Sequence, residues 1–167
     1  MRQTHPRTKK NGRLTVPKRR LLGAYYTPGE VASLLSRWAV VGRDGRILDP
    51  SFGGCAFMEA AVFHLKLSGC RQPGSLVFGV DVDDSCVRHV RENPELVENN
   101  VVFRDFLAIR PNELSGAPFR AIVGNPPYVR HHWLKDERRV MARRIVGEGG
   151  RLLPETASLW AYFVLHA

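Results

Sequence analysis

The chain has 167 residues, a hydrophobic fraction of 44% and a formal net charge of +9. This length corresponds to about one ordinary domain, and the apolar fraction is sufficient for a buried core. We find neither an apolar run of membrane-spanning length nor the pattern of a secretory signal peptide, so no membrane partner is expected. A domain this basic is typical of proteins that bind a polyanion, most often nucleic acid, although a charged surface that maintains solubility explains the charge nearly as well.

The cysteine content argues against two further classes of protein. Cys55, Cys70 and Cys86 are odd in number, and no two of them have the C-x-x-C spacing of a zinc site. The pattern therefore disfavours a disulfide framework, and no metal site is expected. Free thiols are typical of a reducing compartment, so the expected location is cytoplasmic.

The first 20 residues differ in composition from the rest of the chain. Residues 1–20 are rich in lysine and arginine and contain no acidic residue. Such a segment cannot bury enough apolar surface to order itself, so we expect a basic flexible arm. The arm either contacts phosphates or remains a solvated tail, and its composition does not decide between them. Residues 21–167 are expected to form a domain.

The first helix is predicted to begin at Thr27-Pro28-Gly29-Glu30. Thr27 is a suitable capping residue, Pro28 suits the first helical position, and Glu30 can close a capping box. Apolar residues then recur at helical spacing. These residues are Val31, Leu34, Leu35 and Trp38.

Beyond this helix, short apolar runs alternate with helical patterns. The predicted strands are Arg46–Asp49, Leu76–Asp81, Val101–Phe103 and Ala121–Gly124. The predicted helices are Ala56–Leu67, ended by Gly69, Asp84–Asn93, stopped by Pro94, a basic helix over Trp133–Val146, and an apolar, buried helix over Ser158–Ala167. This alternation indicates parallel strands joined by crossover helices, so the expected class is α/β with a mainly parallel sheet.

A glycine-rich turn follows the first strand. The segment from Asp49 to Cys55 reads Asp-Pro-Ser-Phe-Gly-Gly-Cys and opens the next helix. In doubly wound folds, ligands bind beyond the carboxyl ends of the strands, and glycines such as Gly53 let the backbone approach them closely. The segment has neither the G-x-G-x-x-G pattern nor the ending of a phosphate loop. By itself it indicates a ligand site about as well as a plain tight turn.

The second strand ends in acidic residues. Asp81 precedes Val82 and is placed to accept hydrogen bonds from the two ribose hydroxyls of a nucleoside. The alternative is a residue that caps a helix or a turn. Asp83 and Asp84 suit that second task better.

The most specific signal is Asn125-Pro126-Pro127-Tyr128, directly after the fourth apolar strand. The two prolines fix φ and remove backbone donors, which makes a stiff loop. The loop directs the side-chain oxygen of Asn125 and the carbonyl of Pro126 at one point, where both can accept hydrogen bonds from an exocyclic amine. Tyr128 supplies a flat face for stacking. A plain surface turn is the alternative, and the position after a strand disfavours it.

This loop resembles the catalytic motif of amino-group methyltransferases, and Asn-Pro-Pro-Tyr-Val-Arg as a whole is similar to that of the adenine-N6 DNA methyltransferases of restriction-modification systems. Other segments resemble motifs of that family in the same order. They are Gly23–Pro28 (methionine end of the cofactor), Leu48–Phe57 (glycine-rich motif), Val80–Asp83 (ribose), Arg104–Leu107 (cofactor adenine) and Ser158–Phe163 (helix after the catalytic strand). The resemblance covers the chain from about Leu21 to its end.

The resemblance implies a Rossmann-like fold that binds S-adenosyl-L-methionine and methylates an adenine flipped out of duplex DNA. The catalytic residues that it implies are Asn125, Pro126, Pro127 and Tyr128. The cofactor-binding residues that it implies are Tyr26, Thr27, Asp49, Gly53, Asp81, Val82, Asp105 and Phe106.

Two features depart from the family pattern. The family usually has a glycine where Cys55 stands, so an added Cβ near the ligand and a shifted loop are expected. The family's sheet has seven strands, whereas four are predicted here, which implies a domain truncated after the fourth strand and lacking a C-terminal half or target-recognition domain. The fourth strand would then be an uncovered edge, and we expect these residues alone to be inactive in site-specific methylation and poorly soluble.

Two other functions remain open. RNA methyltransferases and methyltransferases of protein glutamine use similar loops, although Tyr25-Tyr26-Thr27-Pro28 ahead of the glycine-rich motif favours the DNA family. A non-catalytic remnant that keeps a nucleotide-binding fold is the second alternative. The sequence specifies neither a DNA recognition site nor an accompanying restriction activity.

Overall fold

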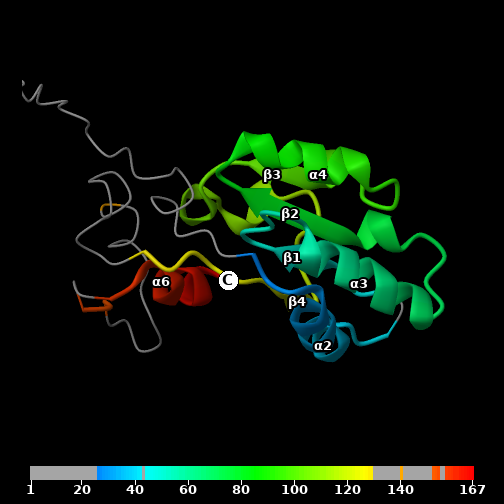
Figure 1. Ribbon diagram of the computed structural model, residues 1–167. Coiled ribbons are helices and arrows are strands. Elements are labelled where there is room, and N and C mark those ends of the chain that lie inside the picture. The colour runs from blue at the N-terminus through cyan, green and yellow to red at the C-terminus, as the bar shows by residue number, and fades with distance from the viewer. Residues whose placement is uncertain (1–25, 43, 130–139, 141–151, 155–156) are drawn as a thin grey trace, which may run out of the picture.

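The computed structural model describes residues 26–42, 44–129, 140, 152–154 and 157–167. The predicted basic arm, residues 1–20, and nearly all of the predicted helix over residues 133–146 lie outside this part of the chain. The described elements form an α/β fold (Figure 1).

Four parallel strands form the centre of the fold. They are β1 (Ile47–Asp49), β2 (Val77–Asp81), β3 (Val101–Phe103) and β4 (Ala121–Ile122), in the order β3-β2-β1-β4. The register places Leu48 of β1 between Phe78 of β2 and Ile122 of β4. The expected parallel α/β class is confirmed, and β4 lies at an edge of the described sheet, as predicted.

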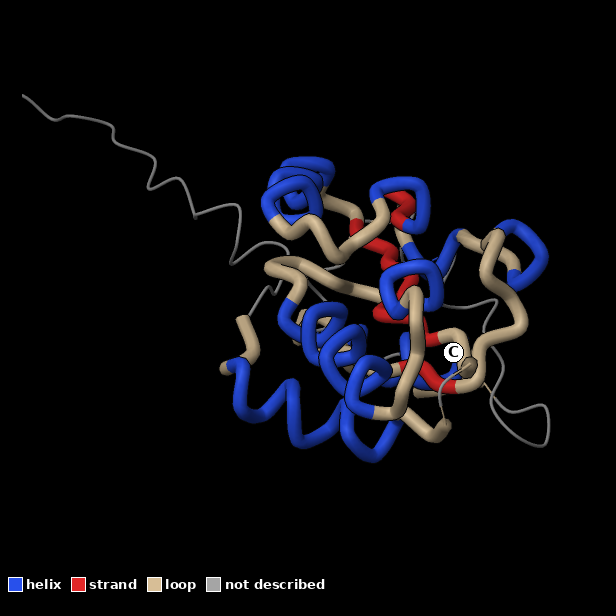
Figure 2. Tube along the Cα trace, turned by 90° about the vertical axis from the view of Figure 1, so that its right-hand side faces the viewer, coloured by secondary structure: helices blue, strands red, loops and turns tan. Residues whose placement is uncertain are grey.

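Helical segments lie on both sides of the strands (Figure 2). On one face, α3 (Ala56–Leu67) and α4 (Val87–Glu92) pack in a cluster that includes Ile47 and Val77. On the other face, α6 (Leu159–His166) packs in a cluster that includes Leu48 and Phe78. Successive residues of a strand point to opposite faces, so a sheet covered on both faces needs apolar residues at every position. The near-continuous apolar runs of β1 and β2 meet this need.

The local pattern predicted most boundaries closely. α3 and β3 have the predicted bounds. Gly69, with a φ of +84°, follows the end of α3 in the left-handed conformation that glycine adopts easily. The predicted helix over residues 84–93 begins as a 3-10 turn, Asp84–Cys86, before α4. The predicted strand over residues 121–124 pairs only as far as Ile122, although the Val123 N–H still donates to the carbonyl of Leu48 at 2.9 Å.

The start of α2 (Gly29–Ala39) differs from the prediction. Pro28, and not Thr27, precedes the first turn, and its carbonyl accepts hydrogen bonds from the N–H groups of Val31 and Ala32. The predicted capping role of Thr27 is wrong because its hydroxyl contacts Asn125 in the fourth-strand loop instead.

In α2, the apolar residues that recur at helical spacing do not form the buried face of the helix. Trp38 and Leu34 belong to the apolar stripe, yet their side chains are 71% and 54% exposed. The buried residues are Ala32 and Ser36, whose small side chains let α2 pack closely on α3. Figure 1 shows α2 beside α3 and β4.

The last helix, α6, is buried on one side. Leu159, Tyr162 and Phe163 enter the core, whereas Val164 is 61% exposed and Trp160 is also exposed. The apolar segment expected to form a buried helix is therefore buried on the side that faces this cluster. None of the helices in the described part of the chain has the length and hydrophobicity that a membrane span requires.

Candidate active site

A cleft opens beyond the carboxyl ends of the strands. In open parallel α/β sheets, this is the position at which ligands bind. The expected site residues that line the cleft are Tyr26, Thr27, Gly53, Asp81, Val82, Asp105, Phe106, Asn125 and Pro127. Of the other three expected residues, Asp49 is buried, Pro126 is partly buried and Tyr128 is exposed. Five separate segments of the chain therefore meet at one edge of the sheet.

The glycine-rich loop between β1 and α3 takes a left-handed backbone at two positions. Gly53 has a φ of +47° and Cys55 a φ of +68°. Gly54 faces the ring of Tyr26 so closely that a Cβ at this position would lie 2.8 Å from a ring carbon. The loop therefore needs glycine at position 54 for the ring to cover it, and it brings backbone N–H groups to the cleft.

Asp81 connects β2 to this loop. Its Oδ2 accepts a hydrogen bond from the N–H of Gly53 at 2.8 Å, and its Oδ1 accepts one from the N–H of Asp83 at 2.8 Å. Burial raises the pKa of Asp81, and these backbone hydrogen bonds oppose the rise. Asp83 caps the next turn through Ser85, at 3.3 Å from its N–H and 2.8 Å from its hydroxyl, as predicted for an acid at this position.

Asp49 is a buried carboxylate beside the cleft. Its side chain is 2% exposed, and its Oδ1 accepts a hydrogen bond from the N–H of Ser51 at 3.0 Å. Its Oδ2 has no hydrogen-bond partner among the described residues. Burial raises the pKa of Asp49 to about 8; the Ser51 hydrogen bond opposes this, and the charge of Asp81 adds to it. Gly124 packs against the group, since a Cβ there would lie 2.6 Å from Oδ1.

Asn125 is held by two other loops. Its side-chain Nδ2 donates a hydrogen bond to Oγ1 of Thr27 at 3.2 Å. Its main-chain carbonyl accepts a hydrogen bond from the hydroxyl of Ser51 at 3.2 Å. Tyr128, three residues later, exposes 58% of its surface. The loop thus has a fixed first residue and an exposed aromatic ring.

An apolar wall closes the other end of the cleft. Asp105 accepts a hydrogen bond from the N–H of Leu107 at 3.2 Å and so caps the 3-10 turn Phe106–Ala108. Phe106 is buried in this turn and packs on Phe163 of α6, with ring centroids 5.3 Å apart. Both rings line the cleft. Helix α6 begins beside the loop that contains Asn125–Tyr128, because the N–H of Leu159 donates to the carbonyl of Val129 at 2.9 Å.

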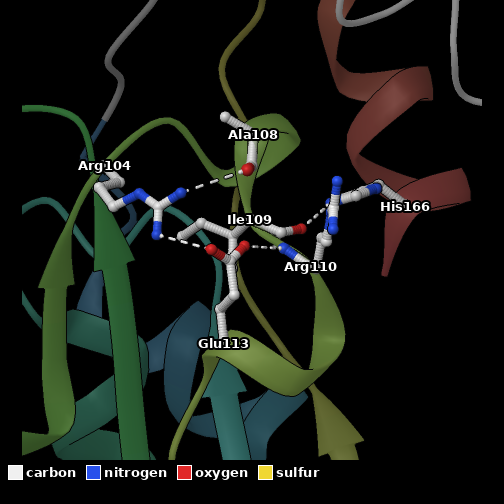
Figure 3. Close-up of polar contacts among 6 residues, drawn as sticks. All are labelled: Arg104, Ala108, Ile109, Arg110, Glu113 and His166. Atoms are coloured by element: carbon white, nitrogen blue, oxygen red, sulfur yellow. Dashed lines mark hydrogen bonds and ion pairs between the residues drawn. The ribbon is translucent and has the colours of Figure 1, made fainter.

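A polar cluster supports the segment behind this wall (Figure 3). Glu113 accepts a hydrogen bond from the N–H of Arg110 at 2.7 Å and contacts the guanidinium of Arg104 at 3.4 Å. The hydrogen bond from Arg110 is the main cause that lowers the pKa of Glu113. His166 of α6 contacts the carbonyl of Ile109 at 2.8 Å. The cluster fixes the turn after β3 and places Arg104 on the cleft wall.

The cleft lining also includes residues outside the expected set, among them Ser51, Arg104 and Phe163. Ser51 lies inside the glycine-rich motif, and Arg104 directly precedes Asp105, so both could have been found by extending the motifs. Phe163 belongs to a segment that resembles a family motif, but no local pattern indicates that its side chain lines the cleft. Its place in the cleft depends on how α6 packs.

Cys55 differs from expectation. Its thiol belongs to the core cluster below α3 and is fully buried, and the cleft is lined by its neighbours Gly54 and Ala56. Cys55 itself does not line the cleft, so it does not add a Cβ beside the ligand site. Its φ of +68° explains why glycine is suited to the position. Burial raises the pKa of the thiol to about 12, which favours a packing role over a nucleophilic one.

A parallel sheet with a glycine-rich loop, a strand-end acid and an Asn-Pro-Pro-Tyr loop around one cleft defines a Rossmann-like methyltransferase fold. Residues 13–167 match the family described as N-6 DNA Methylase, and the chain belongs to that family. The resemblance that the motifs predicted is thereby confirmed.

Known proteins extend this result. The chain is 30% identical over 115 residues to the type II methyltransferase M.XamI of Xanthomonas campestris pv. amaranthicola, covering 66% of this chain and 20% of that protein. The methyltransferase subunit of a type I restriction-modification system from Streptococcus thermophilus superposes with a TM-score of 0.56 at 22% identity, over 85% of this chain and 31% of its own.

The type IIL restriction-modification enzyme MmeI, solved in complex with DNA, superposes with a TM-score of 0.52 at 12% identity, over 83% of this chain and 24% of its own. At these identities the structures establish the fold. The chain spans about a fifth of the curated relative's length.

Proposed function

We propose that this chain carries the cofactor-binding and catalytic residues of an S-adenosyl-L-methionine-dependent DNA adenine-N6 methyltransferase from a restriction-modification system. The observation that carries the proposal is the position of Asn125, which is held at the same cleft as Gly53 and Asp81. Groups suited to a nucleoside cofactor and groups suited to an amine acceptor thus share one cleft. Membership of the N-6 DNA Methylase family supports DNA as the substrate class.

The residues present fit S-adenosyl-L-methionine. A carboxylate has about four acceptor positions, and the backbone N–H groups of Gly53 and Asp83 take up part of this capacity, so the oxygens of Asp81 can also accept hydrogen bonds from ribose hydroxyls. Phe106 and Phe163 form an apolar wall suited to an adenine ring. The buried Oδ2 of Asp49, which has no hydrogen-bond partner among the described residues, suits a cationic ligand better than a phosphate, since a nearby positive charge favours the ionised carboxylate. A cofactor with sulfonium and ammonium groups meets all three conditions.

We therefore assign cofactor binding to the expected set. It comprises Tyr26, Thr27, Asp49, Gly53, Asp81, Val82, Asp105 and Phe106, with Phe163 added. When bound, S-adenosyl-L-methionine supplies an electrophilic methyl group on its sulfonium sulfur. The protein groups contribute orientation and electrostatics rather than covalent catalysis.

The catalytic role falls on Asn125, Pro126, Pro127 and Tyr128. The amine of a base is a poor nucleophile because its lone pair is delocalised into the ring. Acceptors at the Asn125 side chain and the Pro126 carbonyl hold the amine and favour a pyramidal nitrogen. Pro126 and Pro127 keep the loop stiff. Tyr128 is exposed enough to stack on a base that has left the duplex.

DNA is the proposed macromolecular partner. The net charge of +9 supports a polyanionic partner. The chain spans about a fifth of the curated relative's length, and we place recognition of a particular DNA sequence in other parts of such proteins. The proposed location is the cytoplasm, where the three free cysteines stay reduced.

The test is a methyl-transfer assay with a tritium-labelled cofactor and three acceptors: duplex DNA, RNA and a release-factor-like protein with a target glutamine. We expect label in DNA, as N6-methyladenine. Label only in RNA or only in the protein would favour the corresponding amino methyltransferase instead. Absence of transfer to every acceptor, together with absence of cofactor binding, would favour a non-catalytic remnant.

A further inference from the structure

Two hydroxyl groups hold Asn125, and each comes from a different loop of the cleft. Thr27 Oγ1 accepts from Nδ2 of Asn125, 98 residues away in the sequence, and Ser51 Oγ donates to the Asn125 carbonyl, 74 residues away. We propose that Thr27 and Ser51 are positioning residues that set the orientation of Asn125 for methyl transfer. This inference rests on the proposed function, in which Asn125 acts on the acceptor amine.

The contact with Thr27 fixes which way the Asn125 amide faces. The amide carries a donor nitrogen and an acceptor oxygen on opposite sides, and rotation about its last torsion exchanges them easily. Only the oxygen can accept a hydrogen bond from an amine. With Nδ2 engaged by Thr27, Oδ1 lies on the opposite side of the amide. The hydrogen bond with Thr27 therefore restrains rotation of the amide and holds it in this orientation.

The contact with Ser51 fixes the backbone of the same residue. Pro126 and Pro127 lack N–H groups, so this part of the loop cannot be tied by its own backbone donors. The Ser51 hydroxyl instead holds the Asn125 carbonyl, and with it the plane of the peptide bond that leads to Pro126. Ser51 is itself tied, because its N–H donates to Asp49 at the end of β1. The catalytic loop is thus supported by the neighbouring strand.

The experiment compares matched variants of the full-length protein. Thr27→Val and Ser51→Ala remove one hydroxyl each, whereas Thr27→Ser and Ser51→Thr keep it. Ser75→Ala is the control, because it removes a hydroxyl that donates to a backbone carbonyl, that of Gln72, in an exposed turn. The readouts are kcat for methyl transfer, checked against the rate constant of a single turnover, and the cofactor Kd from calorimetry.

We expect Thr27→Val and Ser51→Ala each to lower kcat by about 3- to 10-fold, the range for one neutral hydrogen bond. The cofactor Kd of Ser51→Ala should stay within about 2-fold of wild type, whereas Thr27→Val, at a residue assigned to cofactor binding, should also raise the cofactor Kd. Thr27→Ser and Ser51→Thr should recover most of the rate, and Ser75→Ala should match wild type. In an Asn125→Ala background, Thr27→Val should not lower kcat further, since Thr27 contacts the side chain that is absent there and residues that act through one group are not additive.

Three results would overturn this proposal while leaving the proposed function intact. The first is an unchanged kcat in Thr27→Val and Ser51→Ala although Asn125→Ala is inactive. The second is a change confined to the cofactor Kd. The third is a full additional loss of kcat when Thr27→Val is combined with Asn125→Ala. Near-normal methylation by Asn125→Ala itself would instead refute the proposed function. The two failures are therefore distinguishable.

Discussion

The carboxylate of Asp81 accepts a hydrogen bond from the N–H of Gly53 at 2.8 Å, so the end of β2 holds the loop that follows β1. The second oxygen accepts from the N–H of Asp83. One side chain therefore fixes two loops and faces the cleft. This double task makes Asp81 the first residue to test.

We predict that Asp81→Ala weakens cofactor binding by about 1.5–3 kcal/mol, the range for lost hydrogen bonds to a charged group. Calorimetry with S-adenosyl-L-methionine measures this change. Asp84→Ala is the matched control, because Asp84 is an exposed acid of the next turn. Binding of a 2′-deoxy form of the cofactor separates the two tasks: wild type should discriminate against it and Asp81→Ala should not. Equal affinity of wild type and Asp81→Ala would remove the ribose assignment.

For Asn125→Ala in the full-length protein, we expect most turnover to be lost while the cofactor still binds. The side chain is proposed to act on the acceptor amine and to touch the cofactor only indirectly. Methyl transfer to DNA and calorimetry, measured on the same preparation, check both halves of the prediction. Loss of cofactor affinity as large as the loss of rate would place Asn125 in the cofactor site instead.

Tyr128→Ala should weaken capture of the flipped adenine, because stacking on an aromatic ring contributes about 1–3 kcal/mol per base. The ring of Tyr128 is exposed, so its removal should affect folding little. Tyr128→Phe keeps the stacking face and serves as the control. The measurement is the fluorescence of 2-aminopurine at the target position. A Tyr128→Ala enzyme with unchanged capture and rate would contradict the role.

The buried carboxyl group of Asp49 should make the free energy of unfolding depend on pH. Its pKa is about 8 in the folded chain, against about 3.9 in unfolded peptides. The folded state thus holds the proton more tightly. The contribution of this group to stability is complete below about pH 4 and is lost as the pH rises through about 8, with an upper limit of roughly 5 kcal/mol.

Urea titrations of the ligand-free chain between about pH 5 and pH 9 measure this effect. Asp49→Asn should flatten the profile, because an amide does not titrate in this range. Asp84→Asn, at an exposed position, should leave it unchanged. A free energy of unfolding that rises with pH equally in wild type and in Asp49→Asn would contradict the raised pKa.

The outer faces of α2 and α3 predict self-association. Trp38 and Leu34 of α2 and Phe63 and Leu67 of α3 are all more than half exposed, on helices that pack together. Exposed apolar surface of this kind promotes association between copies of a chain. We expect the 167-residue chain alone to form oligomers or aggregates, and not to methylate one defined DNA sequence.

Light scattering of the purified chain checks the first expectation, and mapping of methylated adenines in plasmid DNA checks the second. Leu34→Lys together with Trp38→Lys should reduce association. Val97→Lys, which adds the same charge at an exposed apolar residue outside these helices, should not. A monodisperse wild-type monomer that methylates a single sequence would disprove both expectations.

The sequence determined the local elements and the identity of the loops. Apolar runs and helical spacing placed α3 and β3 at their bounds, because those patterns reflect side-chain periodicity within a few residues. The prolines after Asn125 and the glycine at position 54 identified loops whose backbone geometry depends on those residue types. Parallel topology then placed these loops at the same edge of the sheet.

Only the tertiary structure decided which side chains meet. The spacing in α2 marked a helix but not its covered face, since contact with α3 selects the small residues Ala32 and Ser36. Thr27 is a suitable helix cap by local rules, yet the fold brings Asn125 close to it, and its hydroxyl accepts a hydrogen bond from the Asn125 side chain instead. The raised pKa of Asp49 and the place of Phe163 in the cleft likewise depend on burial by distant segments. Contacts across such sequence distances follow from how the elements pack, and no local pattern encodes them.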